Sequence, residues 1–278
     1  MVRILSTYRW VNHPLSPLTL QQIAAAGIPK IEVFCASSHF RYADPQQVRE
    51  LSVALSEYHL SLHSLHAPTE RGSGQSISIS DPERIRRQDA VDEVKRALEV
   101  AERIPFSFLV QHLGSSRQPA DGRTTDSAFS SLEHLTVFAK QRGVTIALEN
   151  TPSEIGAPES IVKLVKETHL HDLRFCFDIG HANIGEGVAQ SWELMRDRVV
   201  TTHIHDNHGE KDEHLLPYEG DIDWDAAFEG FGQAAQPPSL VMELKEQGID
   251  NPLLDKIRAA FDRMEEHLDK KGASSPRG

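Results

Sequence analysis

The sequence predicts a single (β/α)8 barrel, and three observations support this fold class. Eight short β-rich segments alternate with longer helical patterns from one end of the chain to the other. A repeat of roughly 35 residues fits eight strand–helix units in a chain of 278 residues. Most of the β-rich segments are almost continuously apolar, as strands that are covered on both faces should be. The alternative is a doubly wound open sheet, but no Gly-x-Gly-x-x-Gly sequence follows the first β-rich segment, so a nucleotide-binding sheet has no support.

The expected strands are five to seven residues long and rich in apolar, β-branched or aromatic residues. In chain order they are Val2–Thr7, Lys30–Cys35, Leu60–Leu65, Phe106–His112, Val144–Glu149, Leu173–Asp178, Val199–His205 and Ser239–Glu243. Helical patterns occupy the segments between these strands and after the last one.

In chain order the expected helices are Thr19–Ala26, Pro45–Tyr58, Pro82–Arg103, Thr125–Arg142, Pro158–Thr168, Gln190–Arg196, Trp224–Phe231 and Pro252–Leu268. Ser80-Asp81-Pro82-Glu83 is a helix-start signal, with an N-cap candidate, an early proline and an early acid. Gly27 and Gly143 stand between a helix and a strand, where a left-handed C-cap glycine belongs. We expect the barrel to span residues 1–269 and the polar segment 270–278 to be a disordered tail.

Composition narrows the class of protein. Hydrophobic residues make up 39% of the chain and charged residues 25%, which is typical of a soluble globular protein. The net charge of −12 argues against broad electrostatic attraction to nucleic acid. The chain has no 18-residue apolar run and no apolar signal-peptide core over Met1–Trp10, so we expect no membrane association and a cytoplasmic location. Cys35 and Cys176 lie in apolar runs and are expected to be buried free thiols.

Ionisable residues stand at the carboxyl ends of six successive expected strands, which is where barrel enzymes build their sites. From the third strand to the eighth, these residues are His66, His112, Glu149, Asp178, His203 and Glu243. One such residue usually just meets solvent, but six in succession indicate a functional site.

The segment His203–His214 is the densest part of this pattern, because it contains four histidines together with Asp206 and Asp212. Imidazole nitrogen and carboxylate oxygen are ligands that divalent metals prefer. We therefore predict a divalent-metal site at the carboxyl end of the barrel. A mixed carboxylate–imidazole site accepts zinc, manganese or cobalt, and more than one ion is compatible with the number of candidate ligands.

Six motifs in the last six strand–helix units carry a family resemblance. They are Ser64-Leu65-His66-Ala67-Pro68, Leu148-Glu149-Asn150, Phe177-Asp178-Ile179-Gly180-His181-Ala182, His203-Ile204-His205-Asp206-Asn207, Asp212-Glu213-His214 and Met242-Glu243-Leu244-Lys245. The chain thereby resembles the xylose isomerase-like TIM-barrel superfamily over about two thirds of its length. That superfamily contains sugar and sugar phosphate isomerases and epimerases, inosose dehydratases and the endonuclease IV family of abasic-site nucleases. The motifs are specific for the superfamily and not for one reaction.

The resemblance to the isomerases and epimerases implies one divalent metal held by Glu149, Asp178, His203 and Glu243. Glu149 and Glu243 would be the catalytic pair, one removing a proton beside the carbonyl of a sugar or keto-sugar and the other returning it, through a metal-bound enediolate. His203 and His205 alternate in direction along the strand, and the resemblance selects His203 as the inward-facing residue.

Three further residues are expected to bind the substrate. His181 would bind a hydroxyl group, His39 belongs to an aromatic and basic loop that could form a wall for a sugar ring, and Lys245 could hold a substrate oxygen.

The resemblance to endonuclease IV implies a different reaction at overlapping residues. In that family three zinc ions promote phosphodiester hydrolysis. The first site would use His66, His112 and Glu149, the second Glu149, Asp178, His203 and Glu243, and the third His181, Asp212 and His214.

Three observations favour the sugar enzyme over the nuclease. The net charge is unfavourable for binding a nucleic-acid duplex. The nuclease family has an aromatic DNA-contacting residue three positions after its first ligand histidine, where this chain has Thr69. The Asp-x-His pair at Asp212–His214 and the loop after it also occur widely in sugar isomerase-like proteins. We expect a metal-dependent isomerase or epimerase of carbohydrate metabolism, with a phosphodiesterase and a keto-inositol or keto-sugar dehydratase as alternatives. The substrate, its phosphorylation and the oligomeric state, a homo-oligomer included, stay open.

Overall fold

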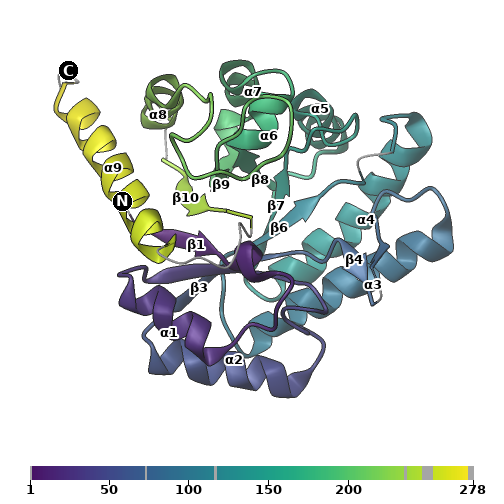
Figure 1. Ribbon diagram of the computed structural model, residues 1–278. Helices are drawn as coiled ribbons and strands as arrows, with labels where there is room; N and C mark the ends of the chain where they lie inside the picture. Colours follow the sequence, from purple (N-terminus) through teal and green to yellow (C-terminus); the bar gives the residue numbers. More distant parts are fainter. Residues whose placement is uncertain (1, 73, 116–117, 235–236, 246–252, 275–278) are drawn as a thin grey trace.

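The computed structural model confirms the predicted barrel. It describes residues 2–72, 74–115, 118–234, 237–245 and 253–274, with side chains described as far as residue 268. Within these residues, eight parallel strands close into a barrel in the order β1-β10-β9-β8-β7-β6-β3-β2 (Figure 1). The strands are β1 (Ile4–Ser6), β2 (Lys30–Phe34), β3 (Ser61–His66), β6 (Phe108–His112), β7 (Thr145–Glu149), β8 (Arg174–Asp178), β9 (Val199–Ile204) and β10 (Ser239–Met242). Each corresponds to a strand expected from the sequence.

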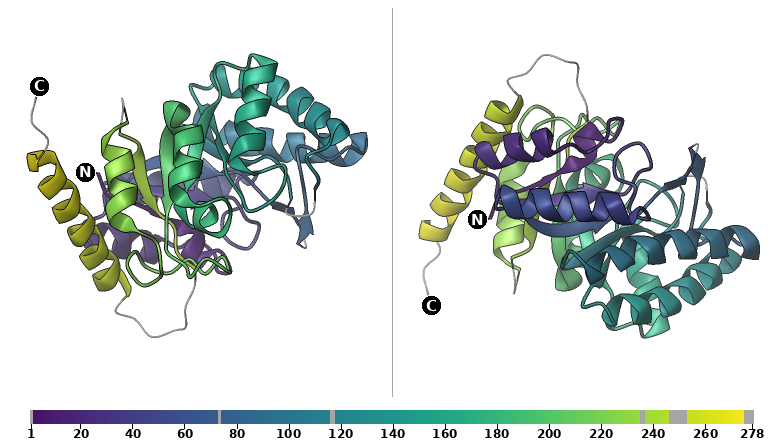
Figure 2. Two further views of the ribbon diagram at one scale, coloured as in Figure 1. Left: turned by 90° about the horizontal axis from the view of Figure 1, so that it is seen from above. Right: turned by 90° about the horizontal axis from the view of Figure 1, so that it is seen from below.

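Helices surround the barrel on its outer face, and Figure 2 shows them packed around the strands from two further directions. They are α1 (Pro17–Ala25), α2 (Pro45–Glu57), α3 (Arg84–Glu99), α4 (Gly122–Lys140), α5 (Pro158–Thr168), α7 (Val188–Met195), α8 (Trp224–Gly232) and α9 (Leu253–Ser274). Helix α9 continues into the segment predicted to be a disordered tail, and residues 275–278 of that tail lie outside the described residues. No helix in the described ranges has the length and hydrophobicity needed to cross a membrane.

Several short elements were not expected from the sequence, and three of them follow the carboxyl ends of strands. A 3₁₀ turn, η1 (Thr7–Trp10), follows β1, and a short helix, α6 (Ile179–Ile184), follows β8. A hairpin of β4 (Glu70–Arg71) and β5 (Gln75–Ser76) follows β3. Two further 3₁₀ turns, η2 (Val100–Glu102) and η3 (Arg196–Arg198), extend α3 and α7. Segments this short show too little periodicity to be recognised in a sequence.

Local signals at the helix ends were partly correct. Gly27 and Gly143 adopt left-handed φ values of 76° and 71°, as predicted for C-cap glycines. The helix expected to start at Pro82 starts two residues later, because α3 begins at Arg84 and the side chain of its N-cap, Glu83, accepts a hydrogen bond from the Ile85 backbone. Ser80 is fully buried, and its hydroxyl donates to Gln118 Oε1 over 3.1 Å.

The interior of the barrel is partly polar. The main apolar core lies between the strands and the helices, whereas a small apolar cluster of Val110, Ala147 and Cys176 stands apart from it. Cys35 and Cys176 are buried and free, as predicted. Barrel interiors are usually filled by branched apolar residues. Fully buried polar residues such as Glu32 and Ser64 therefore mark this interior as specialised.

Candidate metal centre

The four residues predicted to hold a central metal lie together at the carboxyl end of the barrel. Glu149 and Asp178 end strands β7 and β8, His203 lies on β9 and Glu243 follows β10. All four are at most 3% exposed. Parallel pairing aligns Asp178 with His203 on the adjacent strand. One ligand atom from each of the four residues lies within 4.8 Å of the others, so the group is compact enough to hold one cation.

His203 faces this group through its Nδ1 atom. This nitrogen lies 3.1 Å from Glu149 Oε1, 3.5 Å from Glu243 Oε2 and 3.7 Å from Asp178 Oδ2. The three carboxylates therefore converge on one edge of the imidazole ring, as donors around a shared cation would.

A second group consists of His66, His112 and Glu149, as the resemblance implied. His66 Nε2 and His112 Nε2 lie 3.2 Å and 3.0 Å from the same oxygen, Glu149 Oε2. The other oxygen, Glu149 Oε1, faces His203. Glu149 therefore stands between the two groups with one oxygen toward each.

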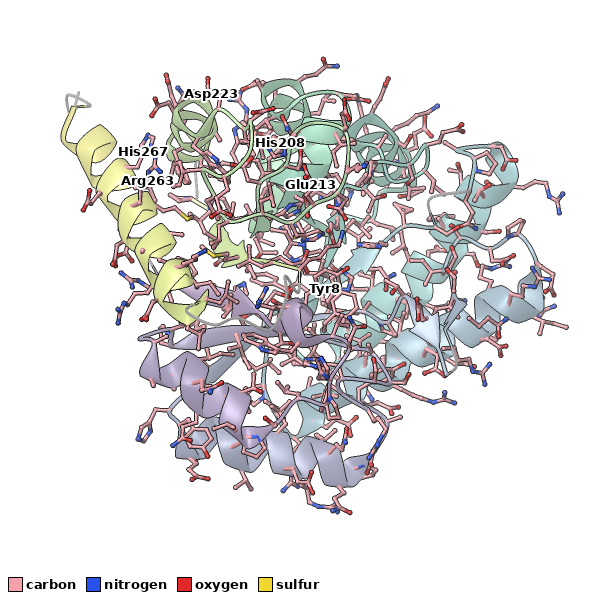
Figure 3. All side chains as sticks on the ribbon, in the orientation of Figure 1. Tyr8, His208, Glu213, Asp223, Arg263 and His267 are labelled. Carbon is pink, nitrogen blue, oxygen red and sulfur yellow. The ribbon has the colours of Figure 1, made fainter. Side chains whose placement is uncertain are left out.

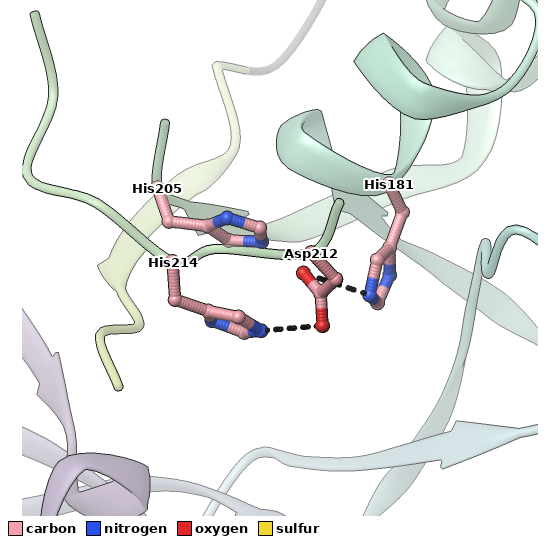
Figure 4. Close-up of side chains that lie close together, drawn as sticks. All are labelled: His181, His205, Asp212 and His214. Carbon is pink, nitrogen blue, oxygen red and sulfur yellow. Dashed lines mark hydrogen bonds and ion pairs between the residues drawn. The ribbon is translucent and has the colours of Figure 1, made fainter. Parts of the chain in front are cut away.

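A third group consists of His181, His205, Asp212 and His214 (Figure 4). His214 Nε2 lies 3.0 Å from Asp212 Oδ2, and His181 Nε2 lies 3.7 Å from Asp212 Oδ1. The His181 ring is oriented by its Nδ1 atom, which lies 2.9 Å from the Asn150 carbonyl oxygen. Its Nε2 atom is therefore the nitrogen that remains for a ligand.

The expectation that only His203 of the pair His203 and His205 faces the barrel interior needs correction. Strand β9 ends at Ile204, so strict alternation no longer applies at His205. The His205 ring is fully buried, stacks on His214 at a centroid distance of 3.9 Å and places Nε2 3.0 Å from Asp178 Oδ1. Both histidines therefore belong to the site.

In the three groups, negative carboxylates and positive imidazoles lie close together and stabilise each other's charged forms. Burial opposes ionisation of Glu149, but the positive charges of His203 and His112 hold the pKa of Glu149 well below its usual range. Burial opposes protonation of His203, yet the carboxylates around it raise its pKa well above the usual value. Burial and the neighbouring Glu149 and Glu32 carboxylates raise the pKa of Glu243 to about 7. A cation bound at His203 Nδ1 would therefore displace a proton from that ring.

The donor set fits a divalent cation. Imidazole nitrogens and carboxylate oxygens together suit zinc, manganese or cobalt. In the third group one buried atom that faces the cavity, Asp212 Oδ1, has no hydrogen-bond partner among the described residues. Buried polar atoms are usually paired, so this oxygen is consistent with a ligand at this position.

A cavity of about 580 Å³ opens above the three groups, a volume in the usual range for small-molecule sites. Tyr8 from η1 and Phe34 from β2 form its aromatic wall. Their ring centroids are 4.9 Å apart, and the Phe34 ring stacks on His66 at 4.2 Å. Figure 3 places Tyr8, on η1, near the centre of the view. Thr69, where the nuclease family has an aromatic residue, also lines the cavity.

Of the three residues predicted to bind substrate, two line the cavity and one does not. His181 and Lys245 line the cavity, and Lys245 Nζ donates to Asp212 Oδ2 over 3.1 Å. His39 is absent from the described residues that line the cavity. Its ring nitrogens contact Thr7 Oγ1 at 2.8 Å and the His13 carbonyl at 2.7 Å. His39 therefore ties the first two loops together, in contrast to the predicted substrate contact.

Sequence reasoning missed Glu32 and Phe34, and it did not foresee that the Asn150 carbonyl orients His181. A signal for Glu32 was present, because it is the one charged residue inside the apolar run Ile31-Glu32-Val33-Phe34. His208 lies outside the three groups. Its ring contacts Glu213 on the exposed loop after β9, and Figure 3 labels both residues.

Known proteins agree with this architecture. A family model for xylose isomerase-like TIM barrels matches residues 20–267. The uncharacterized protein MJ1311 of Methanocaldococcus jannaschii is 29% identical over 216 residues, which cover 74% of this chain and 71% of that protein. A crystal structure of a D-tagatose 3-epimerase-like protein superposes with a TM-score of 0.81 at 24% identity, over 98% of this chain and 99% of the other. A structure of L-ribulose 3-epimerase superposes with a TM-score of 0.80 at 15% identity, over 99% of each chain. Both structural likenesses concern the fold.

Proposed function

The chain belongs to the xylose isomerase-like TIM-barrel family, and from this membership and the geometry of the site we propose that it isomerises or epimerises a sugar or keto-sugar. The observation that supports this proposal is the group of Glu149, Asp178, His203 and Glu243, two of whose carboxylates line the cavity. The epimerase folds that resemble this chain make a ketose the first substrate class to test.

We assign the four residues of this group as ligands of one divalent cation. Such a cation would polarise the substrate carbonyl and so acidify the neighbouring C–H bond. Zinc, manganese and cobalt all suit the donor set.

Glu149 and Glu243 would transfer the proton. One carboxylate removes the proton from the carbon next to the carbonyl, and the other returns a proton to the substrate. Tyr8 and Phe34 would exclude water from one side of the sugar, while His181 and Lys245 would bind hydroxyl groups.

Deuterium exchange tests the proposed reaction. The metal-loaded protein is incubated in D2O with a panel of free and phosphorylated ketoses. Exchange of a C–H hydrogen next to the carbonyl is expected for at least one of them, with or without net conversion. Absence of exchange across the panel, in protein shown to contain its metal, would contradict proton transfer. Loss of water from a keto-sugar or keto-inositol would indicate the dehydratase.

Two amide substitutions test the roles of the carboxylates. Glu149→Gln and Glu243→Gln should each lower turnover by about 100-fold or more, because an amide cannot accept a proton from carbon. His208→Ala, on the exposed loop after β9, is the control and should keep wild-type turnover. Wild-type turnover in either glutamine variant would exclude the two-carboxylate scheme.

A multinuclear phosphodiesterase is the second candidate function. It is favoured by the three adjacent donor groups, two of which share Glu149. Metal content separates the candidates. One ion per chain in the purified protein supports the isomerase, whereas three ions with cleavage of a duplex that contains an abasic site would support the nuclease.

A further inference from the structure

Glu32 is a buried carboxylate that belongs to none of the three donor groups. It lies on β2 and has no measurable exposure to solvent. A carboxylate that is removed from water is strongly destabilising unless charged or hydrogen-bonding groups satisfy it. The question is therefore which groups satisfy Glu32 in the barrel interior.

Both oxygens of Glu32 have a partner. Oε1 lies 3.1 Å from His203 Nε2, and Oε2 accepts a hydrogen bond from the Ser64 hydroxyl over 2.7 Å. Parallel pairing of β2 and β3 places Ser64 beside Glu32. All three side chains are fully buried. The Ser64 hydroxyl thus holds the Glu32 carboxylate in the orientation that meets His203.

The two nitrogens of His203 therefore face opposite environments. Nδ1 faces the carboxylates of Glu149, Asp178 and Glu243, and Nε2 faces Glu32. A neutral imidazole has one N–H group and one lone pair. Coordination through Nδ1 requires the proton to be on Nε2, where Glu32 Oε1 is placed to accept it.

We propose that Glu32 is a positioning residue that holds His203 in the Nε2–H form, with Nδ1 directed at the metal, and that Ser64 in turn orients Glu32. This inference rests on the central metal site of the proposed function. A carboxylate behind a ligand histidine fixes the ring and makes it a stronger donor, and its loss typically lowers metal affinity about 10–100-fold. Glu32 thereby acts on the metal without touching it or the cavity.

Metal titration of Glu32→Gln tests the proposal without any substrate. The variant keeps the size of the side chain and removes its charge, so the dissociation constant for Co²⁺ or Mn²⁺ should rise about 10–100-fold. The visible spectrum of the Co²⁺ protein should change, because the field at the histidine nitrogen changes. Ser64→Ala should shift affinity in the same direction by a smaller factor.

Glu93→Gln is the matched control, because Glu93 is another buried carboxylate with side-chain partners, Tyr42 and Arg96, on the outer helix α3. It should leave metal affinity and the Co²⁺ spectrum unchanged. Folded Glu32→Gln protein with wild-type affinity and spectrum would overturn the proposal. If the variant does not fold, ¹⁵N NMR of histidine in the wild-type Zn²⁺ protein decides, since a proton on Nδ1 of His203 would overturn it equally. If the protein binds metal tightly, and this binding depends on Glu32, but no ketose exchanges a C–H hydrogen with D2O, the proposed function alone is contradicted.

Discussion

His63 shows how one buried residue can couple the stability of this barrel to pH. It is 6% exposed, and its Nε2 atom lies 3.2 Å from Thr201 Oγ1. Burial disfavours the protonated ring and lowers the pKa of His63 to about 4. The unfolded chain takes up this proton near pH 6.5, whereas the folded chain does so only near pH 4.

We therefore expect His63 to lower the free energy of unfolding as the pH falls from 6.5 to 4. The reason is that the unfolded state binds more protons than the folded state in that window. His63→Gln should remove roughly 3 kcal/mol of this pH dependence. Urea unfolding at several pH values, compared between wild type and variant, measures the difference. The same substitution at exposed His134 is the control. Parallel stability curves for wild type and His63→Gln would show that the imidazole is not held neutral.

Most residues of the candidate site could be predicted from the sequence, because histidine and carboxylate side chains are the usual donors of a metal site. Histidine and carboxylate at successive strand ends indicated the site before any contact was known. Glu32 and His205 were missed for geometric reasons. A single glutamate in an apolar strand has no periodic partner, and alternation along a strand does not describe the residue just beyond its end. Their contacts with His203 and Asp178 depend on other strands.

At the scale of elements, helix α6 packs closely on the residue that follows β9. This contact is possible because Gly180 in α6 has no side chain. A Cβ atom at Gly180 would lie 2.0 Å from His205 Cε1. Gly180→Ala should therefore displace the His205 ring or the first turn of α6, and lower stability by about 1–3 kcal/mol.

Gly122→Ala is the matched control, since a Cβ atom there has no neighbour within 4 Å. Thermal unfolding and turnover should both fall for Gly180→Ala and stay near wild type for Gly122→Ala. Equal behaviour of the two variants would mean that the close packing of Gly180 on His205 is not required.

The loop after β9 is the element whose shape could not be foreseen. Asp206 accepts hydrogen bonds from the Tyr218 and Ile222 backbones and from Trp224 Nε1. These bonds curl the loop back, which brings Asp212 and His214 over the barrel. The sequence shows the acidic and histidine residues but not the partners of Asp206, because those partners lie 12 to 18 positions away.

At the scale of the whole molecule, we expect a bound cation to stabilise the fold, because several buried carboxylates converge on one histidine. Glu32, Glu149, Asp178 and Glu243 surround His203 and are all at most 3% exposed. Since a ligand that binds the folded state stabilises it by mass action, saturating Zn²⁺ or Mn²⁺ at 100 times its dissociation constant should add about 2.7 kcal/mol. The Tm should rise by on the order of 5–10 °C.

Thermal unfolding after chelation, and again after each metal is restored, measures this dependence. Asp178→Asn removes one carboxylate of the central group and should abolish most of the rise. A Tm that is indifferent to chelator and metal would contradict a metal centre in the folded protein.

The sequence by itself determined the barrel, its order of strands and helices, and the identity of most site residues. These follow from local periodicity and from the rule that parallel strands end on the same face of a barrel. Only the tertiary structure decided that His205 joins the third group and that the two oxygens of Glu149 face different groups. It also placed His39 in a loop contact and Glu32 behind His203. These features depend on which atoms meet across strands that are far apart in the chain, and no pattern along the sequence records that.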